Sequence, residues 1–190
     1  MARWEPDARE RLVRAALDLF AEQGYDDTTV VQISERAGLT KSTFFRHFPD
    51  KREVLAAGQD TLCQLLSDGI AAAPRSATPL EMVAAALDAA AGAFIPERRD
   101  LVQKMQTAIT ASTELQEREV LKRVGLATVM TDALKKRGLP DPIASLAAEL
   151  GILALKIAHV RWSDPANQQE LAALARQSLH ELQTASATLR

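Results

Sequence analysis

The chain has 190 residues, of which 47% are hydrophobic, 25% are charged and only 4% are aromatic. This composition is ordinary for a globular protein, and the length is enough to bury a core in one or two compact domains. The single cysteine, Cys63, excludes an internal disulfide framework and a cysteine-rich zinc module. The net charge of −2 gives no bulk support for nucleic-acid binding, because domains that bind nucleic acid are usually basic.

Neither a secretory leader nor a membrane span is expected. No apolar run follows Met1, and the most apolar stretch, residues 146–157, is short for a bilayer and contains Glu149 and Lys156. We therefore expect a cytoplasmic protein that does not associate with membranes.

Helix start and stop signals recur along the whole chain, and no strand-like alternation is sustained. Gly24 is typical of a helix end, and Thr29 with Gln32 forms the pattern of a capping box. The sequence predicts an all-α fold of about nine helices, near residues 7–23, 29–38, 41–48, 53–73, 79–94, 97–111, 113–138, 141–162 and 165 onward. We expect a DNA-binding domain over residues 1–52 and a helical regulatory and dimerisation domain over residues 53–190.

Residues 29–48 have the spacing of a helix-turn-helix. Ile33 and Ala37 face inward from the first of its two helices, Gly38 and Leu39 form the turn, and Phe44 anchors the second helix. Spacing alone also fits an ordinary helical hairpin within a bundle.

The residue types on the second of these helices favour DNA binding. Its cap and outward positions carry hydrogen-bond donors that suit phosphates and base edges, namely Thr40, Lys41, Ser42, Thr43, Arg46 and His47. From Arg36 to Arg52 there are five Lys and Arg residues and one acid, Asp50. The basic charge of this slightly acidic chain is concentrated in that segment.

The same region resembles the opening of the TetR family of bacterial regulators. The resemblance is carried by Ala-Leu-Asp-Leu-Phe at 16–20, Gly24-Tyr25, Thr28-Thr29, the run from Ile33 to Phe48, and Asp-Lys-Arg-Glu-Val-Leu at 50–55. It covers about residues 8–56, and beyond them only the architecture is similar. It implies a dimeric, DNA-binding transcriptional regulator rather than an enzyme.

The resemblance also implies which residues meet DNA. Lys41, Ser42, Thr43, Arg46 and His47 stand where the family contacts bases and phosphates in the major groove. Lys51 stands where the family places a lysine against the DNA backbone, and Thr29 and Gln32 would meet a phosphate. Helix N-termini suit that role because their free N–H groups point outward.

Two positions depart from the family pattern. Phe45 stands where the family usually has a tyrosine whose hydroxyl reaches a phosphate, and Val31 stands where an arginine is common. We expect both contacts to be absent here, so that Arg46 and Lys51 carry more of the binding.

The C-terminal half suggests a dimer and a ligand site. Small residues recur along residues 141–162, and apolar residues follow one side of the last helix. The expected interface consists of Gly151, Ala154, Ala158, Trp162, Leu171, Leu174 and Leu182, although these residues also suit a monomeric core. A helix-turn-helix normally reads two half-sites related by two-fold symmetry, which favours a homodimer.

The candidate ligand-binding residues are Phe94, Met105, Ile109, Met130 and His159, each of which also suits plain core packing. His47, His159 and His180 lack metal-ligand spacing, and the sequence has no phosphate loop, Rossmann glycine pattern or nucleophile motif. We expect no metal, no cofactor and no enzymatic activity.

Three functional hypotheses remain open at this point. The first is a repressor that binds a palindromic operator and is released by a small-molecule effector. The second is a constitutive dimeric regulator without an effector. The third is a small helical enzyme, for which no catalytic constellation is present.

Overall fold

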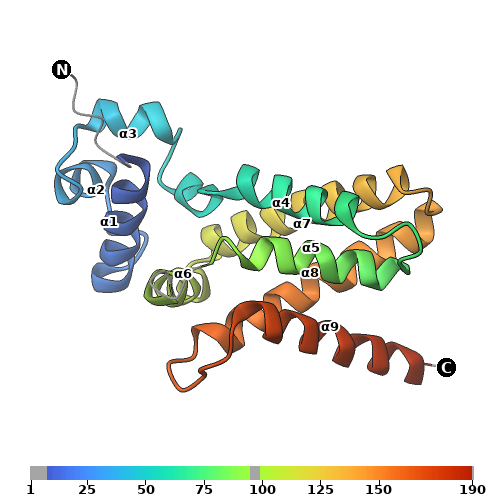
Figure 1. Ribbon diagram of the computed structural model, residues 1–190. Helices are drawn as coiled ribbons and strands as arrows, with labels where there is room; N and C mark the ends of the chain where they lie inside the picture. The colour runs from blue at the N-terminus through green and yellow to red at the C-terminus, as the bar shows by residue number, and fades with distance from the viewer. Residues whose placement is uncertain (1–7, 95–98, 190) are drawn as a thin grey trace. The chain divides into compact units, whose positions relative to one another are not determined.

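A computed structural model describes residues 8–94 and 99–189, and over this part of the chain the fold is all-α with nine α-helices and one 3₁₀ helix (Figure 1). The chain divides into two compact units. One contains the chain up to Ala57 together with Asp100–Leu121, and the other contains Gly58–Arg99 and the chain from Lys122 onward. The all-α prediction is confirmed.

The first unit is built from helices that are not all adjacent in sequence. It holds α1 (Ala8–Gln23), α2 (Val30–Arg36), α3 (Lys41–His47), the 3₁₀ helix η1 (Arg52–Ala56), α6 (Arg99–Ala111) except its first residue, and the start of α7 (Thr113–Lys136). The core combines Leu12, Leu17, Phe20, Ile33 and Phe44 with Ala108 and Leu115 from the later segment. The expected domain of residues 1–52 thus gains η1 and a second, distant segment of chain.

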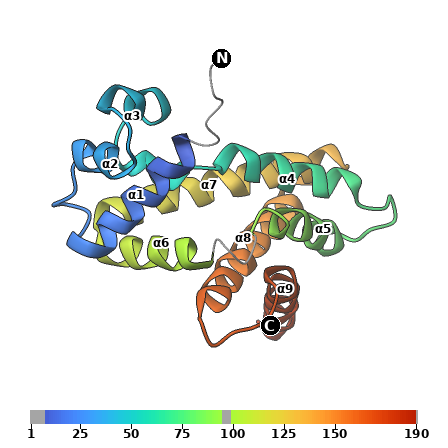
Figure 2. The same cartoon turned by 60° about the vertical axis from the view of Figure 1, so that its left-hand side comes forward.

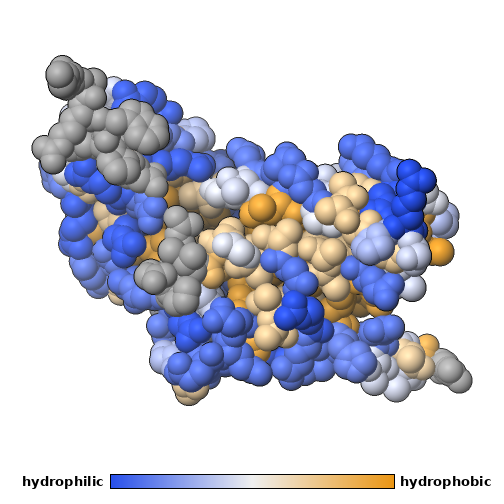
Figure 3. Space-filling view, in the orientation of Figure 1, coloured by the Kyte–Doolittle hydropathy of each residue, from blue (hydrophilic) through white to orange (hydrophobic). Residues whose placement is uncertain are grey.

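The second unit holds α4 (Gln59–Ala72), α5 (Pro79–Ala91), the rest of α7, α8 (Asp141–Ser163) and α9 (Leu171–Thr188) (Figure 2). Helices α4 and α5 pack against each other, as do α8 and α9. A Cβ added at Gly69 of α4 would lie 2.6 Å from the Cα of Ala86, so α4 and α5 touch backbone to backbone there. Apolar side chains gather at the surface over α4 and α5 (Figure 3).

Two expected features are changed by the structure. The predicted helix over 53–73 is split, because Gly58 adopts a left-handed conformation with φ +80° between η1 and α4. Asp50 caps η1, since its Oδ1 accepts from the backbone N–H groups of Arg52 and Glu53.

By length and composition, α8 is long and apolar enough to cross a membrane, because the helix extends beyond the short apolar stretch of residues 146–157. Its inward residues, including Ala144, Ala148, Ile152 and Leu155, are buried against this chain's own helices. A core helix of a globular unit has the same composition.

Candidate nucleic-acid interface

Helices α2 and α3 form the predicted helix-turn-helix. Gly38 takes a φ of +65° in the turn, which a residue with a side chain rarely adopts. A Cβ at Gly38 would also lie 2.8 Å from Nη2 of Arg11, which donates a hydrogen bond to the carbonyl oxygen of Ala37. The backbone conformation therefore favours a glycine at the turn, and a larger residue would also displace the flexible end of the Arg11 side chain.

Helix α3 is amphipathic within two turns. Phe44 and the following Phe48 are buried, with ring centroids 5.6 Å apart, and they anchor the helix to the core. The opposite face exposes Lys41, Ser42, Phe45 and Arg46 at spacings of one, three and four residues, which places them on one continuous surface. We call these four residues the α3 face.

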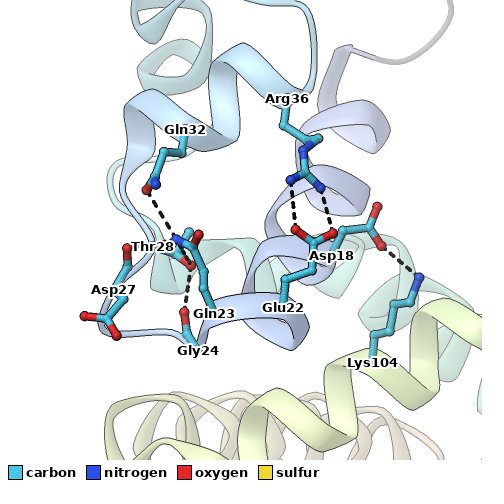
Figure 4. Close-up of polar contacts among 9 residues, drawn as sticks. All are labelled: Asp18, Glu22, Gln23, Gly24, Asp27, Thr28, Gln32, Arg36 and Lys104. Atoms are coloured by element: carbon cyan, nitrogen blue, oxygen red, sulfur yellow. Dashed lines mark hydrogen bonds and ion pairs between the residues drawn. The ribbon is translucent and has the colours of Figure 1, made fainter.

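Two cations of the basic segment, Arg36 and Arg52, form ion pairs with carboxylates. Arg36 donates to both carboxylate oxygens of Glu22 on α1 at 2.8 and 2.9 Å (Figure 4), and this pairing lowers the pKa of Glu22. Arg52 pairs with Asp50 at 3.0 Å. Among the residues that the structure describes, Lys41 and Arg46 have no ion pair, and both lie on the α3 face. The available positive charge is thus confined to one helix surface.

Lys51 is engaged within the unit. Its ammonium lies 2.7 Å from the carbonyl oxygen of Tyr25, 3.3 Å from that of Asp26 and 3.0 Å from that of Thr28, and 4.0 Å from the centroid of the Tyr25 ring. An ammonium has three donors, and these carbonyls occupy them. In this conformation Lys51 orders the loop between α1 and α2, and a contact with DNA would require it to leave those carbonyls.

The polar residues at the starts of α2 and α3 cap their own helices. Thr29 and Gln32 form the predicted capping box, and Oε1 of Gln32 accepts from the Thr29 backbone N–H at 2.8 Å. Thr40 accepts from the backbone N–H of Thr43 at 3.1 Å. Because these side chains are engaged locally, they position the helices rather than offer free donors.

Gln23 strengthens the loop that leads into α2. Its amide nitrogen donates to the carbonyl oxygen of Asp27 at 2.9 Å and approaches Thr28 and Gln32 (Figure 4). His47 is half-buried at the end of α3, and its Nε2 has no hydrogen-bond partner in the described part of the chain.

Inside the first unit, three polar contacts join α6 and α7 to α1, to the loop between α1 and α2, and to η1. The hydroxyl of Tyr25 donates to Glu114 at 2.7 Å, and burial together with this bond raises the pKa of Tyr25. Arg118 pairs with Glu53, and Lys104 pairs with Asp18 at 2.8 Å (Figure 4).

The sequence analysis missed these contacts. Their partners are 65 to 89 residues apart in the chain, and no local pattern joins them.

The expected ligand-binding residues fall into separate places. Met105 and Ile109 pack against the core of the first unit, beside the helix-turn-helix, and so do not join the others. Met130 is fully buried in the second unit, where its Cε would lie 2.9 Å from a Cβ added at Gly151. Phe94 and His159 do lie together, with ring centroids 4.6 Å apart.

The expected dimer residues are mostly buried within this chain. Gly151, Ala154, Ala158, Trp162, Leu171 and Leu174 are all buried, while Leu182 is half-buried. A Cβ at Gly151 would lie 2.7 Å from Val83 of α5, so the small-residue stripe of α8 admits the chain's own helices. An interface on this stripe would require the unit to open its own core.

The geometry defines a helix-turn-helix protein whose second unit is a separate helical bundle. The family model for bacterial regulatory proteins of the tetR family matches residues 12–57. The HTH-type transcriptional regulator TcmR of Streptomyces glaucescens is 37% identical over 84 residues, which cover 44% of this chain and 37% of TcmR. Matches to the first three curated relatives span between 24% and 38% of their length.

Solved structures share the fold across nearly the whole chain. A putative TetR-family regulator from Syntrophomonas wolfei has a TM-score of 0.64 at 17% identity, with 96% of each chain covered. The regulator FadR of Bacillus subtilis, solved in complex with stearoyl-CoA, has a TM-score of 0.59 at 18% identity and covers 91% of this chain and 96% of its own. Residues 12–57 of this chain therefore carry the helix-turn-helix module of the tetR family of bacterial regulatory proteins.

Proposed function

We propose that the chain is a transcriptional repressor that binds a palindromic DNA operator as a homodimer and is released by a small-molecule effector. The observation that carries DNA binding is the α3 face, where Lys41 and Arg46 are the cations of the basic segment that, among the described residues, form neither an ion pair nor a hydrogen bond to a backbone carbonyl. An exposed helix that presents unpaired donors after a glycine turn suits the major groove.

We expect the residues of the α3 face to make two kinds of contact, one with the DNA backbone and one with base edges. Lys41 lies at the first turn of α3, where it can neutralise a phosphate. Arg46 lies one turn further, and its planar guanidinium suits the two acceptors of a guanine edge. Phe45 between them is 48% exposed and lacks the hydroxyl with which a tyrosine at this position would reach a phosphate.

The test is a binding titration against DNA fragments from the neighbourhood of the protein's own gene. Arg46→Ala is expected to cost about 1–3 kcal/mol on one preferred sequence. Lys41→Ala is expected to weaken binding to all sequences and to reduce the salt slope by about 1. The matched control is Arg75→Ala, which removes an exposed arginine from the loop between α4 and α5. Equal losses for Arg75→Ala and Arg46→Ala would contradict the assignment.

The homodimer is proposed to form along the outward face of α8. Apolar residues recur there at alternating spacings of three and four residues, as in a coiled-coil seam: Ile143, Leu146, Leu150, Leu153, Ile157 and Val160. Four of the six are between 42% and 63% exposed in the single chain. A second copy would cover this stripe, and its two-fold symmetry would match a palindromic operator.

Light scattering during size-exclusion chromatography tests the dimer. Leu146→Glu with Leu153→Glu is expected to convert a dimer to a monomer, because each buries an unpaired carboxylate in the seam. Leu121→Glu, on an equally exposed leucine of α7, serves as the control. A monomeric wild-type chain, or a dimer that survives both glutamates, would rule out this face.

The proposal that a small-molecule effector binds is supported by solved structures that share the fold. FadR of Bacillus subtilis was solved with stearoyl-CoA, and a FadR of Thermus thermophilus with lauroyl-CoA. We propose that a small molecule binds in the second unit and shifts the population away from the DNA-binding conformation. A cytoplasmic location follows from this role.

The alternative is a constitutive dimeric regulator. It would be favoured if an extract of the producing cell's small molecules changed neither the operator affinity nor the melting temperature.

A further inference from the structure

The second unit contains a buried hydrogen-bond acceptor without a donor. Nδ1 of His159 lies 2.9 Å from the carbonyl oxygen of Leu155, one turn earlier on α8. A carbonyl oxygen can only accept, so Nδ1 carries the proton and Nε2 carries the lone pair. Nε2 is buried and has no hydrogen-bond partner in the part of the chain that the structure describes.

The imidazole of His159 is neutral at physiological pH. Its pKa is lowered to about 4, chiefly by burial and to a smaller extent by the charge of Lys122, while the hydrogen bond to Leu155 acts in the opposite direction. A neutral ring in this tautomer offers no donor at Nε2, so it cannot bind a carboxylate or phosphate oxygen there. It can accept a hydrogen bond from a hydroxyl or an N–H group.

Two aromatic side chains, Phe94 and Trp162, extend in sequence from the His159 ring. The Phe94 ring meets the His159 ring edge-on with centroids 4.6 Å apart, and it meets the Trp162 ring at 6.3 Å. The guanidinium of Arg99 lies over the Trp162 ring at 5.1 Å and donates to the carbonyl oxygen of Asn167 at 2.7 Å. Nε of Arg99 is a second buried polar atom without a partner among the described residues.

Leaving a buried acceptor unpaired is unfavourable, because the group has lost its hydrogen bond to water, and native structures contain few such groups. The ring that packs on His159 is that of Phe94, which offers no hydrogen-bond donor to Nε2. An uncharged ligand that donates a hydrogen bond would satisfy Nε2 and pack its ring against Phe94.

We propose that the effector is a neutral aromatic compound whose hydroxyl group donates a hydrogen bond to Nε2 of His159. This inference rests on the proposed effector site in the second unit and names its ligand class. It also separates this chain from a receptor for the anionic acyl-CoA esters bound by the FadR proteins.

Three naphthalene compounds that differ in one substituent test whether the ligand donates a hydrogen bond to His159. They are 2-naphthol, 2-methoxynaphthalene, which lacks the donor, and 2-naphthoate, which carries a negative charge. Isothermal titration of the wild-type protein is expected to show 2-naphthol binding about tenfold or more tightly than either of the others, the equivalent of 1.4 kcal/mol. Equal affinity for the methoxy compound, tighter binding of the carboxylate, or no binding of 2-naphthol would overturn the proposal.

A variant and a spectroscopic measurement assign the contact to His159. His159→Phe is expected to abolish the preference for the hydroxyl, whereas His180→Phe, on an exposed histidine of α9, is expected to keep it. The ¹⁵N resonance of His159 Nε2 in the wild-type protein is expected to move upfield when 2-naphthol binds, which needs no variant to fold. A hydroxyl preference that survives in folded His159→Phe, or an unmoved resonance, would refute the assignment.

DNA binding measured on the same samples without probe keeps the two proposals distinguishable. Failure of the probes with intact operator binding overturns the ligand class alone. Loss of operator binding in Arg75→Ala and Arg46→Ala alike overturns the α3 assignment, whatever the probes do.

Discussion

Arg118 of α7 holds Glu53 of η1 through two parallel hydrogen bonds, Nε to Oε1 at 2.8 Å and Nη2 to Oε2 at 2.9 Å. The side chains are only 15% and 25% exposed, and the pairing raises the pKa of Arg118. Planar two-point contacts of this kind are stronger and more specific than single ion pairs. The first unit is thereby closed by a contact between segments 65 residues apart.

Breaking this pair should destabilise the protein. Arg118→Ala is expected to lower the free energy of unfolding by about 1–2 kcal/mol, because Glu53 keeps its partial burial without its partner. Arg176→Ala, which removes a more exposed pair with Asp88, is the control and should change stability by less than about 0.5 kcal/mol. Urea denaturation measures both. Equal effects would mean that the geometry of the Arg118 pair adds nothing.

Tyr25 should make stability fall in alkaline solution. Its pKa is raised above the ordinary value of 10.0, chiefly by burial and then by the bond to Glu114, so the folded protein keeps the phenol proton when the unfolded chain has lost it. Stability from this group is complete below pH 10 and declines above it, by about 1.4 kcal/mol per pH unit at most.

The matched variant for this effect is Tyr25→Phe. It should be less stable than the wild type at neutral pH by about 1 kcal/mol, since the bond to Glu114 is lost. The difference between the two proteins should shrink as the pH rises from 9.5 to 11, in chemical denaturation at each pH. A constant difference would show that Tyr25 ionises equally in both states.

Phe45→Tyr should strengthen operator binding. The ring is exposed on the α3 face, between Lys41 and Arg46, so an added hydroxyl costs no burial. One hydrogen bond to a phosphate should add about 0.5–1.5 kcal/mol, roughly a twofold to tenfold gain. Competition titrations with related DNA sequences check it, and the gain should be the same for all of them, since a phosphate carries no sequence. An unchanged operator affinity would mean that residue 45 lies away from the phosphates of the DNA backbone.

Gly69→Ala should destabilise the second unit strongly. Its Cβ would lie 2.6 Å from Ala86 Cα and 2.7 Å from Ala85 O, both backbone atoms that cannot move aside cheaply. We expect a loss of about 2 kcal/mol or more by thermal unfolding. Gly92→Ala is the control, because its φ is −61° and its nearest atom is 3.4 Å away. If the two variants melt alike, α4 and α5 are further apart than the structure has them.

Local signals made the DNA-binding half largely predictable. The Thr29–Gln32 capping box, the turn at Gly38 and the buried Phe44 depend on neighbours within a few residues, and each was predicted. The split at Gly58 was not, because a glycine within an apolar helical pattern is compatible with a continuous helix.

Long-range contacts explain the rest of what the sequence left open. Met105 suits a ligand pocket as well as a core, and only its packing against the buried cluster of the first unit assigns it there. Long-range packing also decides the role of the small residues of α8, which suit a dimer interface and a monomeric core equally well by sequence. Close approach is needed within the chain itself, at Val83, and the larger residues remain outside.

The contact between Lys51 and three carbonyl oxygens gives the two lysines of this region different chemical reactivity. The Lys51 ammonium is held against three carbonyl oxygens inside the first unit, so its nitrogen is less accessible to an acylating reagent than an exposed amine. Lys41 is exposed and should be labelled quickly, whereas Lys51 should be labelled slowly with or without DNA. Operator DNA should protect Lys41 alone, so peptide mass spectrometry after brief acetylation would map the surface that faces the double helix.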